Sequence, residues 1–135
     1  MGMFRTWLSA AALSGVPSTV HALLTGRDAL AATRAAGAVL GRPGLARGVL
    51  AHVGVSAGWT AVLAAVDRRW ALGAVGGAVA GAVIAVVDLE VVGRRWPAVR
   101  ALPRGPQWAD HLAFGALVGA SLRASRRGRP SIADR

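Results

Sequence analysis

Six ionisable residues stand inside or beside long uncharged stretches of this chain, and they are its candidates for chemistry: His21, His52, Asp88, Glu90, Asp110 and His111. Imidazole and carboxylate groups that meet inside a protein can bind a divalent metal ion or relay protons. An ionisable side chain in an apolar helix is costly to bury unless it is paired. Each of the six therefore indicates either a functional site or an ion pair.

Four of these residues are expected to meet at one depth of a helical bundle. His21, His52, Asp88 and His111 each lie four to six residues inward from the nearest loop. The sequence predicts a polar cluster in one membrane leaflet, in which the histidines are nitrogen ligands and Asp88 is a carboxylate ligand or a proton acceptor.

A structural interpretation competes with this one, and the sequence favours it. Asp88 or Glu90 would pair with Arg94 or Arg95, Asp110 would cap the start of its helix, and the histidines would form hydrogen bonds near the membrane surface. Glu90 and Arg94 are four residues apart, which suits an ion pair on a helix. No HExxH, HxxxH or paired ExxH motif is present, so the spacing carries no metal signature and the cluster is only a candidate metal site; we predict no cofactor and no catalytic residue.

Four apolar stretches must position the six residues. A helix rises ~1.5 Å per residue and the hydrocarbon core is ~30 Å thick, so about 20 residues cross it. The fold class predicted is an all-α integral membrane bundle, formed by one domain over residues 1–124. Its four transmembrane helices are expected at 4–26, 47–66, 70–93 and 106–124. The fourth stretch is the most polar, and the basic tail 125–135 is predicted to be disordered.

Three local features refine this threading. The Ala-rich segment 27–47 predicts a short interfacial helix between the first two spans, or else a solvated loop. Pro17 should kink the first span. That span also loosely imitates a signal peptide, whose cleavage near Ala22 would leave three spans.

The charge of the chain indicates lipid as its partner and excludes several enzyme classes. All sixteen basic residues are Arg, and with six acidic residues the net charge is +10. These arginines separate apolar stretches and form no basic stripe, so we expect no nucleic-acid binding. The chain has no Cys, which excludes disulfides and thiolate sites, and no Lys, which excludes phosphate-loop and Schiff-base lysines.

Orientation in the membrane is nearly undetermined. Eight arginines lie on each of the two predicted membrane faces, so the positive-inside rule does not decide between them. The dense basic tail next to the last span slightly favours cytoplasmic termini. Trp7 and Trp70 mark one interface, and Trp96 and Trp108 mark the other. Trp59 falls in the middle of a span, where it is expected to pack against helices or lipid.

Glycines at four-residue spacing predict close helix packing in three spans. The pattern occurs at Gly73, Gly77 and Gly81, at Gly54 and Gly58, and at Gly115 and Gly119. Residues four apart share one helix face, and glycines on it let two backbones approach closely. Such faces also allow a homo-oligomer.

Two short phrases carry a family resemblance. They are Gly-Val-Pro-Ser-Thr-Val-His-Ala at 15–22 and Trp-Ala-Asp-His-Leu-Ala-Phe-Gly at 108–115. They resemble segments of small bacterial membrane proteins of the YagU-like group. The resemblance covers parts of spans one and four, and it implies a multi-pass protein of the bacterial cytoplasmic membrane without assigning a catalytic residue.

The function that the sequence favours is a structural or accessory helical bundle with Gly-mediated packing. The alternative is a proton-coupled or metal-ion transporter that uses the His/Asp cluster, and a membrane-bound metalloenzyme is a weaker third class. Substrate and oligomeric state are not encoded in any recognisable motif.

Overall fold

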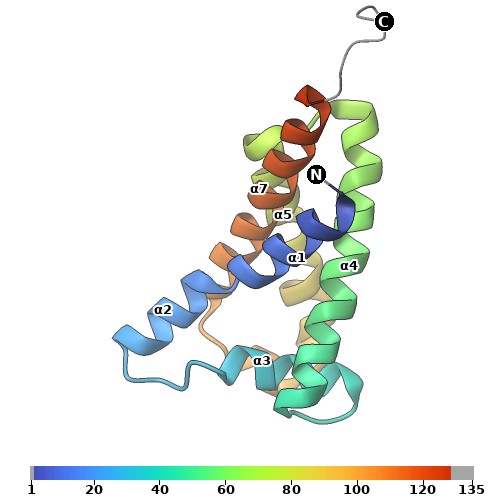
Figure 1. The fold of residues 1–135 in the computed structure, drawn as a ribbon. Helices are drawn as coiled ribbons and strands as arrows, with labels where there is room; N and C mark the ends of the chain where they lie inside the picture. Colours follow the sequence, from blue (N-terminus) through green and yellow to red (C-terminus); the bar gives the residue numbers. More distant parts are fainter. Residues whose placement is uncertain (1, 129–135) are drawn as a thin grey trace, which may run out of the picture.

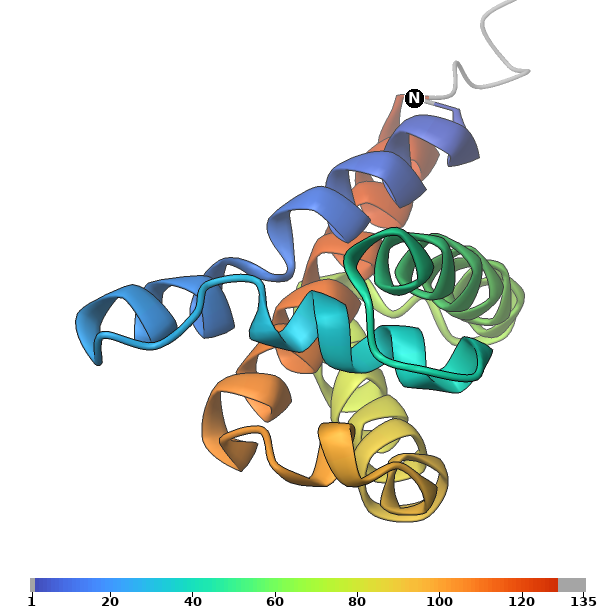
Figure 2. The ribbon, with the colours of Figure 1, turned by 90° about the horizontal axis from the view of Figure 1, so that it is seen from below.

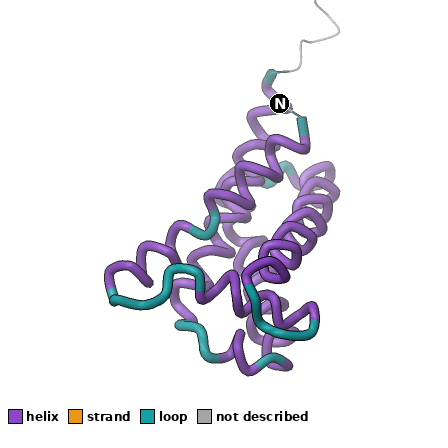
Figure 3. Tube along the Cα trace, turned by 60° about the horizontal axis from the view of Figure 1, so that its bottom comes forward, coloured by secondary structure: helices purple, strands orange, loops and turns teal. Residues whose placement is uncertain are grey.

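The computed structural model describes residues 2–128, which form a bundle of helices (Figure 1). The elements are α1 (Met3–Leu13), α2 (Val16–Leu24), α3 (Ala31–Ala36), η1 (Gly37–Leu40), α4 (Leu45–Trp70), α5 (Gly73–Ala85), η2 (Val86–Val92), η3 (Gly93–Arg95), α6 (Pro97–Arg100) and α7 (Arg104–Arg127). Loops are confined to short connections between the helices (Figure 3). Within residues 2–128 no β-strand is present, so the all-α prediction is confirmed.

Three helices are long and apolar enough to cross a membrane. They are Met3–Leu24, Leu45–Trp70 and Gly73–Arg95, with mean hydropathies of 1.2, 1.7 and 2.0. These helices agree with the first three predicted spans. The fourth predicted span corresponds to α7, which has 24 residues but is too polar to meet the same standard.

The helices α5 and α7 form the most extensive contact in the bundle, and glycines allow it. A Cβ atom built on Gly77 would overlap the backbone carbonyl oxygen of Gly115, and one built on Gly81 would overlap that of His111. From the other side, a Cβ on Gly119 would overlap the carbonyl oxygen of Gly73. The predicted packing role is confirmed for these glycines, which form one continuous contact that we call the glycine ladder (Gly73, Gly77, Gly81, Gly115 and Gly119).

The glycines of α4 behave differently. No atom lies within 4 Å of a Cβ built on Gly54 or on Gly58, apart from their own helix. No other helix of the described chain packs on these two glycines, so their predicted packing role stays a prediction. Spacing identifies a smooth helix face, but it does not say whether another helix lies against that face.

The first predicted span is divided into α1 and α2 by a break at Ser14 and Gly15. Pro17 is the second residue of α2. Its ring lacks an N–H and would clash with a carbonyl one turn earlier, so a continuous helix is disfavoured here. Seen from below, α2 leads away from the bundle beyond this break (Figure 2).

The segment predicted as a short interfacial helix contains α3 and η1, which pack on the start of α4. A Cβ on Gly48 would overlap the carbonyl oxygen of Thr33, so the two helices meet backbone to backbone. The backbone N–H of Gly44 also donates to the carbonyl of Arg34 over 3.0 Å. The predicted helix is thus present, and it is anchored to α4 by its own backbone.

At the other end of the chain, α7 continues to Arg127. The disordered tail was predicted from residue 125, so that boundary is wrong by three residues. Residues 129–135 of the predicted tail lie outside the described part of the chain.

Candidate functional site

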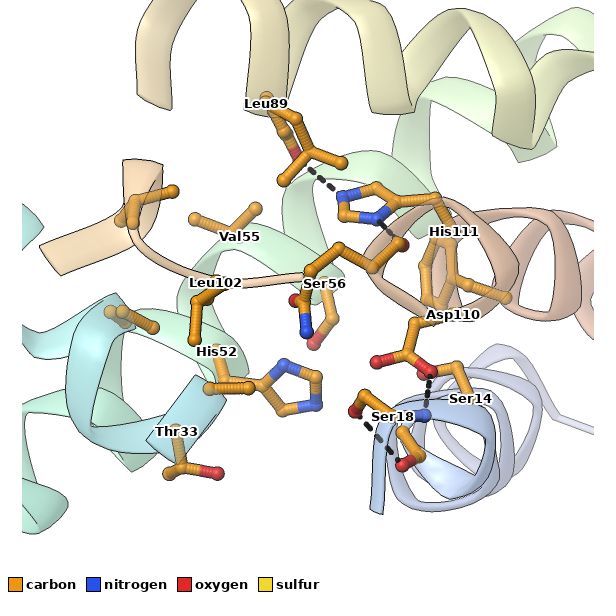
Figure 4. A pocket seen from close by; sticks show the side chains of 18 of the residues that line it. Ser14, Ser18, Thr33, His52, Val55, Ser56, Leu89, Leu102, Asp110 and His111 are labelled. Carbon is orange, nitrogen blue, oxygen red and sulfur yellow. Dashed lines mark hydrogen bonds and ion pairs between the residues drawn. The ribbon is translucent and has the colours of Figure 1, made fainter. Parts of the chain in front are cut away.

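A cavity of about 630 Å³ lies between the helices, and it is the main candidate site. Its walls come from α1 and α2, from α4, from the segment Ile84–Gly93 and from α7, and α3 and α6 contribute further lining residues. Most lining residues are apolar. The polar groups include Ser14, Ser18, His52, Ser56, Trp59, Asp88, Asp110 and His111, several of which point toward one another (Figure 4).

Asp88 is held in this cavity by two neighbours. The indole Nε1 of Trp59 donates to both carboxylate oxygens, over 3.0 and 3.2 Å, and the Nε2 of His111 lies 3.4 Å from Oδ2. Asp88 stands in η2, which is a π-helical segment. Such widened turns are rare in proteins and are frequent at functional sites.

The protonation of His111 follows from its hydrogen bonds. Its Nδ1 lies 2.8 Å from the carbonyl oxygen of Gln107. A carbonyl only accepts, so Nδ1 carries a proton and donates it. A second proton on Nε2 turns the contact with Asp88 into an ion pair, and without that proton Nε2 faces the carboxylate as a second acceptor. The pair Asp88–His111 is therefore a place where one proton changes the local charge.

Asp110 binds the start of another helix, not its own. The backbone N–H of Ser18 donates to Asp110 Oδ1 over 2.9 Å. Ser18 is the third residue of α2, whose N-cap residue Gly15 offers no side chain. A carboxylate at a helix N-terminus satisfies a free N–H and suits the helix dipole. The prediction that Asp110 caps the start of α7 is thus wrong, because this carboxylate caps α2 across the cavity.

His52 lines the same cavity, with its Nε2 2.9 Å from the carbonyl oxygen of Ala11. This bond joins α4 to α1. His21, in contrast, lines a second cavity of about 320 Å³ together with Arg27 and Asp28. His21 belongs to α2, which leads away from the bundle after the break (Figure 1).

The predicted four-residue cluster is therefore only partly assembled. Asp88 and His111 are in contact, His52 shares their cavity, and His21 does not. Among the described residues, no group of three or more His, Cys, Asp or Glu side chains is placed to hold a metal ion. The arrangement supplies hydrogen-bonding groups and carboxylates to a cavity, and it does not supply a ligand set.

Glu90 forms the predicted pair with Arg94, over 3.3 Å, and a second one with Arg104 over 3.6 Å. Arg104 also donates to the carbonyl oxygen of Leu89 over 3.1 Å. These contacts join η2 to the start of α7 outside the cavity. The structural interpretation is confirmed for Glu90, whereas Asp88 pairs with His111 and not with an arginine.

Several site residues were not found from the sequence. Trp59 was expected to pack against helices or lipid, yet its indole N–H holds Asp88. Ser56 accepts a hydrogen bond from Trp7 Nε1 over 3.0 Å, although Trp7 was assigned to the membrane interface. The signal available for Trp59 was its place in mid-span, since an indole N–H buried in an apolar region needs an acceptor.

Comparison with models of protein families, with curated proteins and with solved structures finds no match to this chain.

Proposed function

We propose that this chain is a multi-pass membrane protein that binds a small amphipathic molecule in the cavity between α4 and α7. The observation that carries this proposal is the cavity itself. It has the size of a ligand pocket, its lining is mostly apolar, and its few polar groups converge from different helices.

The surface of the bundle supports a location in lipid. Large apolar side chains point outward from the three apolar helices, and Leu24, Val75, Val79 and Leu50 are 82%, 80%, 64% and 64% exposed. The buried core is small and centres on Leu63, Ile84, Phe114 and Val118 with Ala10. A soluble monomer rarely exposes so much apolar surface, whereas lipid would cover it.

A fourth crossing by α7 is part of the proposal. The glycine ladder holds α7 against α5, which is the first part of the candidate span Gly73–Arg95, and this contact supports a position of α7 at the same depth. Its polar residues Gln107, Asp110 and His111 line the cavity, away from lipid. The polar residues that lower the mean hydropathy of α7 therefore face the inside of the bundle.

Cysteine labelling tests this arrangement, because the chain has no native Cys. We expect Leu112→Cys and Ala120→Cys, on exposed positions of α7, to resist a charged maleimide in proteoliposomes, since a thiol in hydrocarbon does not ionise. Gly105→Cys, near the start of α7, should react. Labelling of all three at similar rates would place α7 in water and would contradict the fourth crossing.

The sequence favours a structural role in which glycine faces mediate helix packing, and the structure supports such packing within one chain. The glycine ladder joins two helices of one chain, so it stabilises the fold and is not available to a second copy. The open face at Gly54 and Gly58 remains available for homo-oligomer formation.

A cavity-filling substitution tests ligand binding. Val55 lines the cavity from α4, and Val62, two turns further along the same helix, does not. We expect Val55→Phe to weaken saturable binding of triphenylphosphine oxide, a neutral amphipathic probe, by about ten-fold, because the larger phenyl ring occupies ligand space. The measurement is equilibrium dialysis in maltoside micelles, corrected with protein-free micelles.

The matched control for that experiment is Val62→Phe, which should bind the probe as the unaltered protein does. Absence of saturable binding to the unaltered protein would refute the proposed function. Equal binding by the Val55 and Val62 variants would show that the probe binds outside this cavity.

Proton-coupled transport is the second candidate function, and the Asp88–His111 contact favours it. The two groups lie 3.4 Å apart in a cavity between helices, where a carboxylate and an imidazole can exchange a proton. Metal-ion transport has no comparable support among the described residues, since no three candidate ligands converge.

A further inference from the structure

We propose that the molecule bound in the cavity is an amphipathic organic cation, and that the Asp110 carboxylate is its counter-ion. This inference rests on the proposed function, since it specifies the charge of the ligand in the same cavity. It follows from the charges that line the cavity, from the hydrogen bonds of the two carboxylates and from the aromatic side chains around them.

The carboxylates that line the cavity are negative, whereas the chain as a whole is positive. The whole sequence carries +10, yet none of the arginines within residues 2–128 lines this cavity. Two carboxylates do line it, those of Asp88 and Asp110. An anionic ligand would meet two negative groups there, and a cationic ligand would meet charges of opposite sign.

The two carboxylates are not equally available to a ligand. Both oxygens of Asp88 accept from Trp59, and one of them also faces His111. Asp110 accepts from Ser18 with Oδ1, and its other oxygen points into the cavity (Figure 4). Asp88 is thus held by the protein, while Asp110 presents an oxygen atom to whatever occupies the cavity.

Among the described residues no ion pair involves Asp110, although the imidazoles of His52 and His111 are near enough to interact with its charge. The imidazoles that line the cavity belong to His52 and His111. His52 is bonded to Ala11 through Nε2, and the ring nitrogens of His111 face Gln107 and Asp88. A carboxylate inside a membrane protein is costly without a partner, so a bound cation would stabilise the ionised form of Asp110.

The rest of the lining suits an apolar body with a positive charge. Trp59, Trp96 and Phe114 contribute aromatic rings to the wall. Aromatic faces attract cations, and the attraction is stronger where water is displaced. Aliphatic residues such as Ile84 and Leu89 supply apolar contact for the remainder of the ligand.

Probes of nearly equal shape and different charge test the inference. Equilibrium dialysis in maltoside micelles would compare tetraphenylphosphonium, tetraphenylborate and neutral triphenylphosphine oxide on the full chain. We expect the phosphonium cation to bind at least ten-fold more tightly than the neutral probe, and the borate anion not to saturate. A ten-fold ratio of affinities corresponds to about 1.4 kcal/mol. Hydrogen bonds to charged groups contribute free energies of about this size.

Asp110→Asn is the decisive variant, because its amide oxygen can still accept from Ser18 and cap α2. It should remove the preference for the cation, by about ten-fold or more, and should not weaken binding of the neutral probe. Glu90→Gln is the matched control, since it removes an acid outside the cavity, and it should keep the preference.

The outcomes separate the two proposals. Saturable binding of the neutral probe without preference for the cation would overturn the inference and leave the proposed function standing, as would a preference that Asp110→Asn does not change. Failure of every probe to saturate would overturn both.

Discussion

Replacement of Gly77 by Ala is expected to lower the free energy of unfolding by about 3 kcal/mol, at the upper end of the cost of overpacking. The added methyl group would overlap the carbonyl oxygen of Gly115, and it would lie 3.2 Å from the Cα atom of Gly119. Both obstacles are backbone atoms, so no side chain can rotate away. The helices α5 and α7 would have to separate along the ladder. Unfolding in mixed micelles of maltoside and dodecyl sulfate measures the effect.

The matched control is the same substitution on α4. Gly58 also belongs to a pair of glycines four residues apart, but a Cβ built on it meets no atom within 4 Å. Because Ala favours a helix more than Gly does, Gly58→Ala should leave stability unchanged or raise it by up to about 1 kcal/mol. If Gly77→Ala proved as stable as Gly58→Ala, the close approach of α5 and α7 would be wrong.

A second large loss of stability, about 2 kcal/mol, is expected from Asp67→Ala. The Asp67 side chain is 7% exposed, pairs with Arg126 at the end of α7, and accepts from the backbone N–H of Leu72 over 2.9 Å. It therefore joins α4, α7 and the turn before α5. Breaking a fully buried pair costs about 3 to 5 kcal/mol, and the value is lower here because Arg126 is 38% exposed.

Asp28→Ala is the control for that prediction. Asp28 pairs with Arg34, but the two side chains are 47% and 45% exposed. A pair so accessible to solvent contributes less than about 1 kcal/mol. Thermal unfolding followed by circular dichroism should show a clear loss for the Asp67 variant and almost none for the Asp28 variant. The same loss in both would mean that burial of Asp67 does not matter.

Helix positions could be predicted from the sequence because hydrophobic length and glycine spacing are local signals. Stretches without charge located the three apolar helices to within a few residues. The ladder glycines could be predicted for a similar reason, since residues four apart share a face whatever lies beyond it. Pro17 indicated the break in the first span, because its effect acts one turn away in the chain.

The partners of individual side chains could not be predicted, because they depend on where the helices lie relative to one another. Asp110 caps α2 over a separation of 92 residues, and Trp59 reaches Asp88 over 29. Gly54 and Gly58 have the same spacing as the ladder glycines and meet nothing. His21 lies at the expected depth in the sequence, but the direction of α2 after the break removes it from the cluster.

The polarity of α7 has a consequence for how the chain is made. The helix Gly73–Arg95, which begins with α5, is long and apolar enough to cross a membrane, whereas α7 does not meet that standard and carries Asp110 and His111. During synthesis α5 leaves the ribosome first, and its row of glycines is then a ready surface for the later helix. The proposed fourth crossing would therefore couple membrane insertion of α7 to its docking on α5.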